Sequence, residues 1–464
     1  MEPLAWIAEH RAGFADWLTA QRWYGDKSRA LASVEFEAIS MVDADGVPVW
    51  LIAVSCRFDG GGNAQYFVPL VAERNRAPQD AMESQAFRRW LAQGFAEKRS
   101  LAATARPGAR LCWEPIPGSV AADWTSDHGK LLAGEQSNTS VIYAGSAILK
   151  VFRRLQPGIN PDSEIVAFLT SRTAYHHVPE FLGSFLLRLE DGGPPVELGA
   201  VQAFVENEGD CWRWLPRALE TSTPGDLETL LEPIALLGRR TGELHAALAG
   251  STELDAFRPE PFTIDDVEAE VSRLAAELAS TFTMIRRQDA MTDQECDDLE
   301  TALRDRLPGV DVLEGLPRIR VHGDYHLGQV LRVGGDFVII DFEGEPSRPM
   351  SERRKKHSPL KDVAGMLRSL DYAASSARFT MAGKADSALR SWSVTAERAF
   401  LDGYRESVVG APIQLVPRDD ARFQAALDLF MIDKALYEAR YELDNRPDWL
   451  GIPLDGLRRV GART

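Results

Sequence analysis

The sequence predicts an α+β protein with two lobes, preceded by a small β-rich unit. Strand-like runs separated by turn residues dominate the first 205 residues, and helix-length amphipathic segments dominate the rest of the chain. At 464 residues the chain is also too long for one ordinary core, because domains usually hold about 100 to 200 residues. We therefore expect a β-rich domain over residues 1–105, a mixed lobe over 106–205 and a mostly helical lobe over 206–464.

The first unit is expected to contain a β-hairpin. Residues 47–54 and 64–71 are strand-like, and the glycine-rich turn 59–63 separates them. A helix is expected over 83–98. Turn-forming residues gather over 105–128, where we place the first boundary.

The rest of the chain changes from strands to helices. Strands are expected at 140–144, 147–152 and 198–205, with a helix near 161–173. Beyond residue 206, helices are expected at 225–249, 265–281, 293–306, 360–378, 387–407 and 419–444, with two short strands at 329–333 and 337–341.

Composition and charge restrict the class of function. Apolar residues make up 45% of the chain and charged residues 26%, as in ordinary globular proteins. The formal net charge of −17 disfavours nucleic acid and anionic membranes as partners, so we expect a small-molecule substrate. The four cysteines are widely spaced, which favours a reducing cytoplasm over a disulfide framework. Neither a signal-like start nor an 18-residue apolar run occurs, so neither export nor membrane insertion is expected.

The most informative segment runs from Val321 to Glu343. Phosphoryl transfer requires little covalent help from a protein, which mainly orients the attacking hydroxyl and holds the metal ion on the phosphates. Asp324 is the predicted proton acceptor. Gln329 and Asp341 are the predicted Mg²⁺ ligands, because an amide oxygen, a carboxylate and ATP phosphates suffice for this ion.

Each of these residues also has an ordinary structural interpretation, such as a turn cap for Asp341. Their combined order of acid, amide and acid around a short hairpin favours an ATP-dependent phosphotransferase. We expect His322 to brace the loop, whereas His326 either contacts a sugar or supports the loop.

Residues 134–140 are predicted to form a turn that presents hydroxyl and backbone N–H groups to the phosphates of ATP. The turn has a single glycine, unlike the P-loop pattern GxxxxGK[ST] or the kinase pattern GxGxxG. Its candidate nucleotide contacts are Gln136, Ser137, Asn138, Thr139 and Ser140.

Lys150 is a second candidate for nucleotide binding. It lies in an apolar strand-like run, where a charge requires a partner, and Glu164 on the next predicted helix is the expected partner. The alternative is a solvated lysine on an edge strand. After the last strand of this lobe, residues 206–210 are expected to contact adenine through backbone groups. Gln202, Phe204 and Val205, just before them, complete the predicted nucleotide site.

These motifs resemble the aminoglycoside-phosphotransferase and kinase-like superfamily. More specifically, they resemble the bacterial maltokinases, both free-standing and associated with trehalose synthase. The segments that carry the resemblance are 21–24 (QRWY), 135–140 (EQSNTS), 150–154 (KVFRR), 157–161 (PGINP), 322–331, 341–346 (DFEGEP), 358–369 and 445–449 (NRPDW).

The resemblance implies a bilobal protein-kinase-like fold, similar to the aminoglycoside phosphotransferases, with an N-terminal cap domain over residues 1–105. It also implies ATP- and Mg²⁺-dependent phosphorylation of maltose at its anomeric hydroxyl, giving maltose 1-phosphate for α-glucan and glycogen synthesis. A trehalose synthase is the implied protein partner. The pair Phe342-Glu343 differs from the Phe-Gly of protein kinases but agrees with this family.

The substrate side is expected on the last long helix. Lys434, Tyr437, Glu438, Tyr441 and Glu442 fall on one helical face, which suits a sugar but also a helix packed through its tyrosines. Trp449 is either a stacking platform or a buried plug. The residues predicted to contact the sugar are His326, Glu343, Arg348, Lys434, Glu438, Tyr441 and Trp449.

Two other functions remain open from the sequence. The first is a kinase of another sugar or aminosugar, such as glucosamine, because related folds differ mainly in their substrate pockets. The second is an ATP-binding protein without catalysis that docks on a trehalose synthase.

Overall fold

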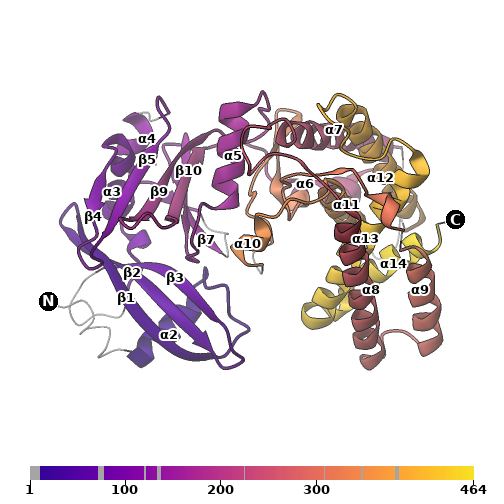
Figure 1. Cartoon of the computed structure of the whole chain (residues 1–464), viewed down its shortest axis with the longest axis horizontal. Coiled ribbons are helices and arrows are strands. Elements are labelled where there is room, and N and C mark those ends of the chain that lie inside the picture. The colour runs from indigo at the N-terminus through magenta and orange to yellow at the C-terminus, as the bar shows by residue number, and fades with distance from the viewer. Residues whose placement is uncertain are drawn as a thin grey trace. The chain divides into compact units, whose positions relative to one another are not determined.

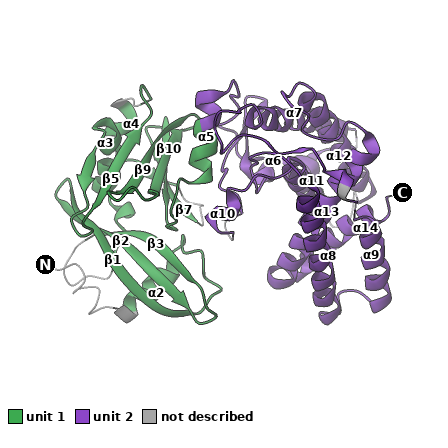
Figure 2. Cartoon of the chain, in the orientation of Figure 1, with its two compact units in different colours: residues 1–167, 179–206 green, residues 168–178, 207–464 purple. Residues whose placement is uncertain are grey.

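The computed structural model describes residues 11–71, 78–119, 122–132, 137–223, 225–307, 309–345, 348–381 and 386–463. The chain divides into two compact units (Figure 2). Unit 1 comprises residues 1–167 and 179–206, and unit 2 comprises 168–178 and 207–464. The sheets of unit 1 and the helices of unit 2 confirm the predicted α+β class (Figure 1). The predicted division into three domains remains a prediction.

The first sheet of unit 1 is an antiparallel meander of β1 (Leu31–Ala44), β2 (Val47–Phe58) and β3 (Asn63–Val71). Helix α2 (Arg11–Ala20) contributes Phe14 and Leu18 to the apolar cluster of this sheet. The sequence analysis missed β1, although polar and apolar residues alternate along part of it, as is typical of a half-buried strand.

The second sheet of unit 1 has seven antiparallel strands in the order β4-β5-β9-β10-β8-β7-β6. Helices α3 (Gln85–Ala96), α4 (Ala122–Ser126) and α5 (Pro161–Arg172) accompany it. β4 precedes the predicted boundary at residue 105 and β5 follows it, so one sheet spans that position. The strands are β4 (Ser100–Ala102), β5 (Ala109–Pro115), β6 (Lys130–Leu131), β7 (Asn138–Tyr143), β8 (Ala147–Phe152), β9 (Phe181–Leu189) and β10 (Val196–Ala203).

Unit 2 is mostly helical, and most residues of its helix α11 are buried. Its helices are α6 (Cys211–Thr221), α7 (Leu231–Leu248), α8 (Ile264–Arg287), α9 (Asp293–Asp305), α10 (Met350–Arg353), α11 (Leu360–Thr380), α12 (Asp386–Val408), α13 (Asp420–Asn445) and α14 (Gly451–Gly461). Two small sheets complete it. The first pairs the distant strands β11 (Glu260–Pro261) and β12 (Pro317–Arg318), and the second is a hairpin of β13 (Val330–Val333) and β14 (Asp336–Ile339).

Three helices of unit 2 were not predicted, namely α6, the short α10 and α14. Helix α6 contains Pro216, a residue that usually ends a helix, and α14 carries Gly456 in its interior. The predicted helix over 225–249 is a 3₁₀ turn at Leu227–Leu230 followed by α7. In α6 and α14, packing in the folded protein overrides the low helix preference of proline and glycine.

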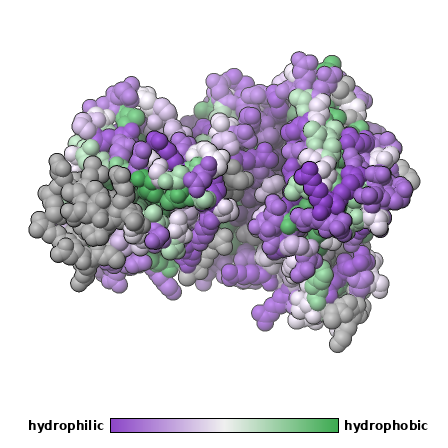
Figure 3. Space-filling view, turned by 90° about the horizontal axis from the view of Figure 1, so that it is seen from below, coloured by the Kyte–Doolittle hydropathy of each residue, from purple (hydrophilic) through white to green (hydrophobic). Residues whose placement is uncertain are grey.

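The face of the molecule shown in Figure 3 is largely hydrophilic where residues are described. Hydrophilic residues cover much of the face seen in Figure 3, and the hydrophobic areas on it are small. Among the described residues, no helix is both long and apolar enough to cross a membrane.

Candidate active site

A buried carboxylate fixes the loop that carries Asp324. Asp362, near the start of α11, is 1% exposed. Its two oxygens accept hydrogen bonds from the backbone N–H groups of His322, at 2.7 Å, and Gly323, at 2.9 Å. The ring of His245 on α7 lies 3.1 Å from the same carboxylate. Two helices therefore hold the loop through one side chain, and the sequence analysis did not identify it.

The ring of His322 connects this loop to the segment that carries Asp341. Its Nε2 lies 3.0 Å from the carbonyl oxygen of Ile340, and its Nδ1 accepts a bond from the N–H of Asp324 at 3.4 Å. The ring also packs against Phe342. These contacts agree with the bracing role expected for His322.

Asp324 itself is partly exposed, so its carboxylate can reach a substrate. Gly323 before it has φ of +84°, a conformation that favours glycine and turns the chain into the loop. The Nζ atom of Lys434 on α13 lies 3.7 Å from its carboxylate. Asp324 and Lys434 line one pocket of about 460 Å³, open solvent included.

Gln329 and Asp341 lie together, as the sequence predicted. The amide of Gln329 donates to Asp341 at 3.0 Å, which leaves the amide oxygen as a candidate ligand. Asp341 has φ of +67°, a strained conformation for a residue with a side chain and one that gathers at functional sites. The described residues contain no group of three or more histidine, cysteine or acidic side chains that could hold a metal ion. One carboxylate and one amide nevertheless fit an Mg²⁺ ion that takes its other ligands from ATP and water.

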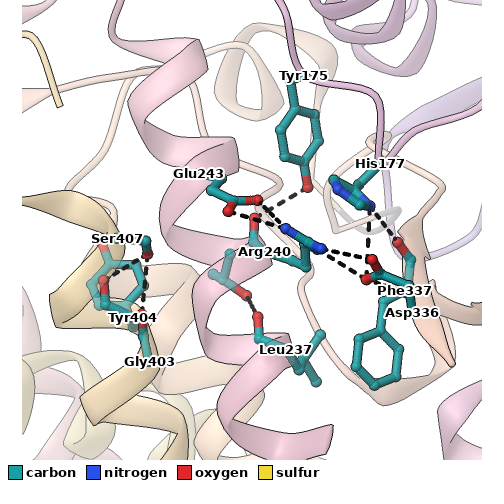
Figure 4. Close-up of polar contacts among 11 residues, drawn as sticks. Tyr175, His177, Leu237, Arg240, Glu243, Asp336, Phe337, Gly403, Tyr404 and Ser407 are labelled. Carbon is teal, nitrogen blue, oxygen red and sulfur yellow. Dashed lines mark hydrogen bonds and ion pairs between the residues drawn. The ribbon is translucent and has the colours of Figure 1, made fainter. Parts of the chain in front are cut away.

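The hairpin between Gln329 and Asp341 is fastened to the rest of unit 2 (Figure 4). The guanidinium of Arg240 on α7 forms two hydrogen bonds with Asp336, at 2.6 and 2.9 Å, and also pairs with Glu243. The ring Nδ1 of His177 lies 3.1 Å from the carbonyl oxygen of Phe337. These contacts fix the strand that leads to Asp341.

The predicted sugar contacts fall into two groups. Arg348 and Lys434 line the pocket beside Asp324, together with Tyr437. His326 accepts a bond from the N–H of Gly328 at 3.0 Å through Nδ1, which supports the loop, and burial lowers its pKa. Glu343 lies 3.7 Å from the guanidinium of Arg353.

The other three residues predicted to contact the sugar, Glu438, Tyr441 and Trp449, lie outside the described lining of this pocket. Glu438 pairs with Arg368 on α11 at 2.8 Å. The ring of Trp449 stacks on Tyr372, with 6.4 Å between ring centroids, and Tyr441 is about half exposed. The described lining of the pocket beside Asp324 includes none of these three predicted residues.

In unit 1, Lys150 is buried and paired. Its Nζ lies 3.1 Å from Asp162 in the first turn of α5, and the amide of Gln202 donates to the same carboxylate oxygen at 2.9 Å. The sequence analysis did not name Asp162, and the pairing of Lys150 with Glu164, two residues further along the helix, stays a prediction. β8 lies between β10 and β7 in the sheet, so the alternative of an edge-strand lysine is wrong.

Three residues of the predicted phosphate-binding turn lie in a strand. Asn138, Thr139 and Ser140 begin strand β7, because they pair with Phe152, Val151 and Lys150 of β8. Ser137 is exposed just before the strand, and Gln136 lies outside the described residues. The hydroxyl of Thr139 accepts a bond from Arg153 at 2.8 Å.

The last two predicted nucleotide contacts follow strand β10. The N–H of Phe204 donates to the carbonyl oxygen of Ser146 at 2.9 Å, and Val205 is partly buried. Both residues therefore continue the chain directly from the strand that carries Gln202.

Comparisons with known proteins match two parts of the chain to described families. Residues 128–344 match the model of the phosphotransferase enzyme family, and residues 17–100 match that of the maltokinase N-terminal cap domain. A glucosamine kinase of Streptacidiphilus jiangxiensis is 30% identical over 75% of this chain and 76% of its own length. A glucosamine kinase of Mycolicibacterium smegmatis is 28% identical over 69% of this chain and 76% of its own length.

Solved structures show the fold. A glucosamine kinase in complex with glucosamine, ADP and inorganic phosphate has a TM-score of 0.69 at 24% identity, over 96% of this chain and 99% of that one. Another crystal form of glucosamine kinase gives 0.70 at 23% identity over the same shares. The predicted kinase-like fold with a cap domain is confirmed. The chain therefore belongs to the phosphotransferase enzyme family of aminoglycoside-phosphotransferase-like kinases, in the group that carries the N-terminal cap domain of the maltokinases.

Proposed function

We propose that this protein is an ATP-dependent sugar kinase that phosphorylates maltose at its anomeric hydroxyl, giving maltose 1-phosphate and ADP. The bond between the γ-phosphorus and the bridging oxygen breaks, and a bond forms between that phosphorus and the sugar oxygen. Asp324 accepts the hydroxyl proton, and Lys150 contacts the phosphates of ATP. Magnesium, when bound with ATP, would be held by Asp341 and the amide oxygen of Gln329 and would neutralise charge on the phosphates.

The proposal that the acceptor is a neutral sugar rests on how the charges around the pocket beside Asp324 are paired. Glu277 pairs with Arg440 at 3.2 Å, and Asp433 pairs with Arg273 at 2.9 Å. Glu345 likewise pairs with Arg348. A wall of paired charges offers both donors and acceptors without a large excess of either sign, which suits the hydroxyls of a neutral sugar.

The aromatic face of α13 supports an acceptor longer than one ring. Tyr437 lines the pocket, and Tyr441 follows one helical turn later with much of its ring exposed. A second glucose ring resting there would supply binding energy that orients the reacting ring. Glucose alone should then have a lower kcat as well as a higher KM.

Glucosamine is the second candidate acceptor. The two curated relatives are glucosamine kinases, and five carboxylates against four cationic side chains line the pocket, a small excess that an ammonium group would offset. A third candidate, ATP binding without catalysis, predicts nucleotide affinity with no turnover on any acceptor.

A panel of acceptors assayed with Mg·ATP separates these candidates. Maltose should exceed glucose and glucosamine in kcat/KM, and phosphorus NMR should place the ester on C1. Tyr441→Ala should remove most of the advantage of maltose over glucose while leaving turnover of glucose within a few-fold. Faster turnover of glucosamine, or an ester on C6, would reject maltose and leave the kinase activity standing.

The proposed activity also suggests a metabolic role and a protein partner. A cytoplasmic kinase that makes maltose 1-phosphate would supply α-glucan and glycogen synthesis. A trehalose synthase would then act beside it on the same class of sugar. Copurification of the two proteins, followed by size-exclusion chromatography of the mixture, tests their association.

A further inference from the structure

A second hollow in unit 2 lies apart from the proposed active site. It encloses about 560 Å³, open solvent included, among residues of α11, α12 and α14. Within the described part of the chain, its lining shares no residue with the pocket beside Asp324.

The wall of this hollow is basic, although the chain as a whole is acidic. Four arginines line it, namely Arg378, Arg390, Arg458 and Arg459, against two aspartates. The resulting excess of two positive charges stands in a chain with a net charge of −17. Asp386, which pairs with two of these arginines, reduces the excess to one. Such a local reversal of sign attracts an anion.

The aspartates hold the arginines in place without using all of their donors. Arg390 donates to Asp386 through Nε at 2.8 Å, and Arg458 donates to Asp455 through Nη1 at 3.0 Å. A guanidinium group carries five N–H donors in a rigid fork. Arg390 is 54% exposed and Arg458 47% exposed, so both guanidinium groups remain partly open to solvent.

An ordinary set of surface ion pairs is the alternative explanation of this cluster. Exposed pairs typically contribute about 0 to 1 kcal/mol each, and they require neither a concave surface nor an excess of one sign. This cluster has both features. Forked donors around a concavity match a phosphate group, which accepts paired hydrogen bonds from arginine.

The rest of the hollow suits a sugar ring. Ser393 donates to Asp371 at 3.2 Å, and both residues line the hollow, where Asp371 also pairs with Arg459 at 2.6 Å. An adjoining hollow shares Ser375 and Arg378 with the first and adds the ring of Phe379, which is 59% exposed. An exposed aromatic ring next to polar groups fits the C–H face and the hydroxyls of a sugar.

We propose that this hollow binds a phosphorylated sugar, with its phosphate on the arginines and its ring against Phe379. The site is distinct from the proposed active site, and the inference does not depend on which acceptor the kinase uses.

Isothermal titration calorimetry of the full chain tests the proposal, with saturating ADP and Mg²⁺ so that phosphate does not titrate the nucleotide site. The probes are glucose 1-phosphate, inorganic phosphate and glucose. Glucose 1-phosphate should bind at least tenfold more tightly than phosphate, and any binding of glucose, which the proposed active site also admits, should be the same in wild type and in the arginine variants. The variant Arg390→Gln with Arg458→Gln should weaken glucose 1-phosphate at least tenfold.

Two further variants sharpen the test. Arg405→Gln is the matched control, because Arg405 is also on α12, is also paired with an aspartate, and lies about 22 Å along the helix from Arg390. It should leave binding within twofold. Phe379→Ala should weaken glucose 1-phosphate several-fold and leave phosphate unchanged.

Three results would overturn the proposal. An isotherm for glucose 1-phosphate that is unchanged in the double arginine variant places the ligand elsewhere. Equal affinity for phosphate and glucose 1-phosphate would show that the sugar ring adds nothing to binding. An equal loss of affinity in the Arg405→Gln control would show that the effect is not specific to this hollow. If the double variant has a lower melting temperature than wild type, the single variants Arg390→Gln and Arg458→Gln are titrated separately with glucose 1-phosphate. Each should weaken binding at least threefold.

Discussion

Exposure distinguishes Asp324 from the carboxylate that supports its loop. The side chain of Asp324 is 23% exposed, whereas Asp362 is 1% exposed and bonded to two backbone N–H groups. A carboxylate whose oxygens are occupied cannot take a proton from a substrate without losing those bonds. We therefore assign proton transfer to Asp324 and positioning of the loop to Asp362.

Asp324→Asn is expected to lower kcat by about 100-fold to 10,000-fold, the usual contribution of a positioned general base. The amide keeps the shape of the side chain, so affinity for ADP should stay within about threefold of wild type. Steady-state assays and titration with ADP measure the two quantities. The control Asp255→Asn changes a carboxylate that is 88% exposed and should be neutral. Activity of Asp324→Asn within a few-fold of wild type would exclude Asp324 as the base.

Glu197 on β10 should make stability depend on pH. Burial raises its pKa from 4.5 to about 7, although Ser184 and the N–H of Asn160 donate to it. Between these values the folded protein keeps a proton that the unfolded chain has lost. The stabilisation is therefore complete below pH 4.5 and is lost as the pH rises through 7.

Glu197→Gln removes this titration, so between pH 5 and 8 wild type should lose about 2 to 3 kcal/mol relative to the variant. Urea unfolding at four pH values measures the difference. Glu114→Gln on strand β5, which β9 separates from β10, changes an exposed carboxylate of the same sheet and serves as the control. Parallel pH profiles for wild type and Glu197→Gln would contradict the assignment.

Among the elements, α7 and α12 approach each other through glycines. A Cβ atom at Gly238 of α7 would lie 2.1 Å from the carbonyl oxygen of Phe400 on α12. A Cβ atom at Gly403 of α12 would lie 2.1 Å from the carbonyl oxygen of Ala235 on α7. Backbone atoms form both contacts, so no side chain can move aside to make room. The separation of these helices is set by the absence of two side chains.

Gly238→Ala should therefore destabilise unit 2 by about 3 kcal/mol, at the upper end of the usual cost of overpacking, although alanine favours helix. Thermal unfolding followed by circular dichroism gives the shift. Gly451→Ala is the matched control, since it also lies in a helix and its Cβ would meet no atom within 4 Å. Equal melting temperatures for Gly238→Ala and wild type would show that the helices can separate at little cost.

Across the whole molecule, a buried ion pair joins the cap sequence to the sheet that carries Lys150. Arg153, just after β8, donates to Asp80 at 2.6 Å, and Trp23 donates to the same oxygen at 3.0 Å. The N–H of Phe67 on β3 donates to the carbonyl oxygen of Arg153 at 2.6 Å. All of these residues belong to unit 1, so the cap sequence and the strand of Lys150 share one compact unit.

Asp80→Asn should destabilise unit 1 by about 3 kcal/mol, because the arginine that remains is buried without a counter-charge. Differential scanning calorimetry should show two transitions, and the change should lower only one of them. Glu35→Gln, which removes an exposed partner of Arg57 in the same unit, should shift neither. One transition that moves as a whole would show that the two units unfold together.

The sequence by itself determined the features that are local. Helices α8, α9, α11, α12 and α13 follow from apolar periodicity within each segment. The spacing of Gln329 and Asp341 around a tight turn likewise predicted that they lie close together. Such features depend on neighbours a few residues away, which the sequence displays directly.

Only the tertiary structure decided the partners of the buried charges and the shape of the cavities. Asp362 reaches the loop of Asp324 from about one turn into another helix, and Asp80 reaches Arg153 from 73 residues away. The arginines of the second hollow come from the consecutive helices α11 and α12 and from the distant helix α14. A buried charge must be paired, but which of many carboxylates pairs with it depends on how whole elements pack, and no local pattern in the chain records that choice.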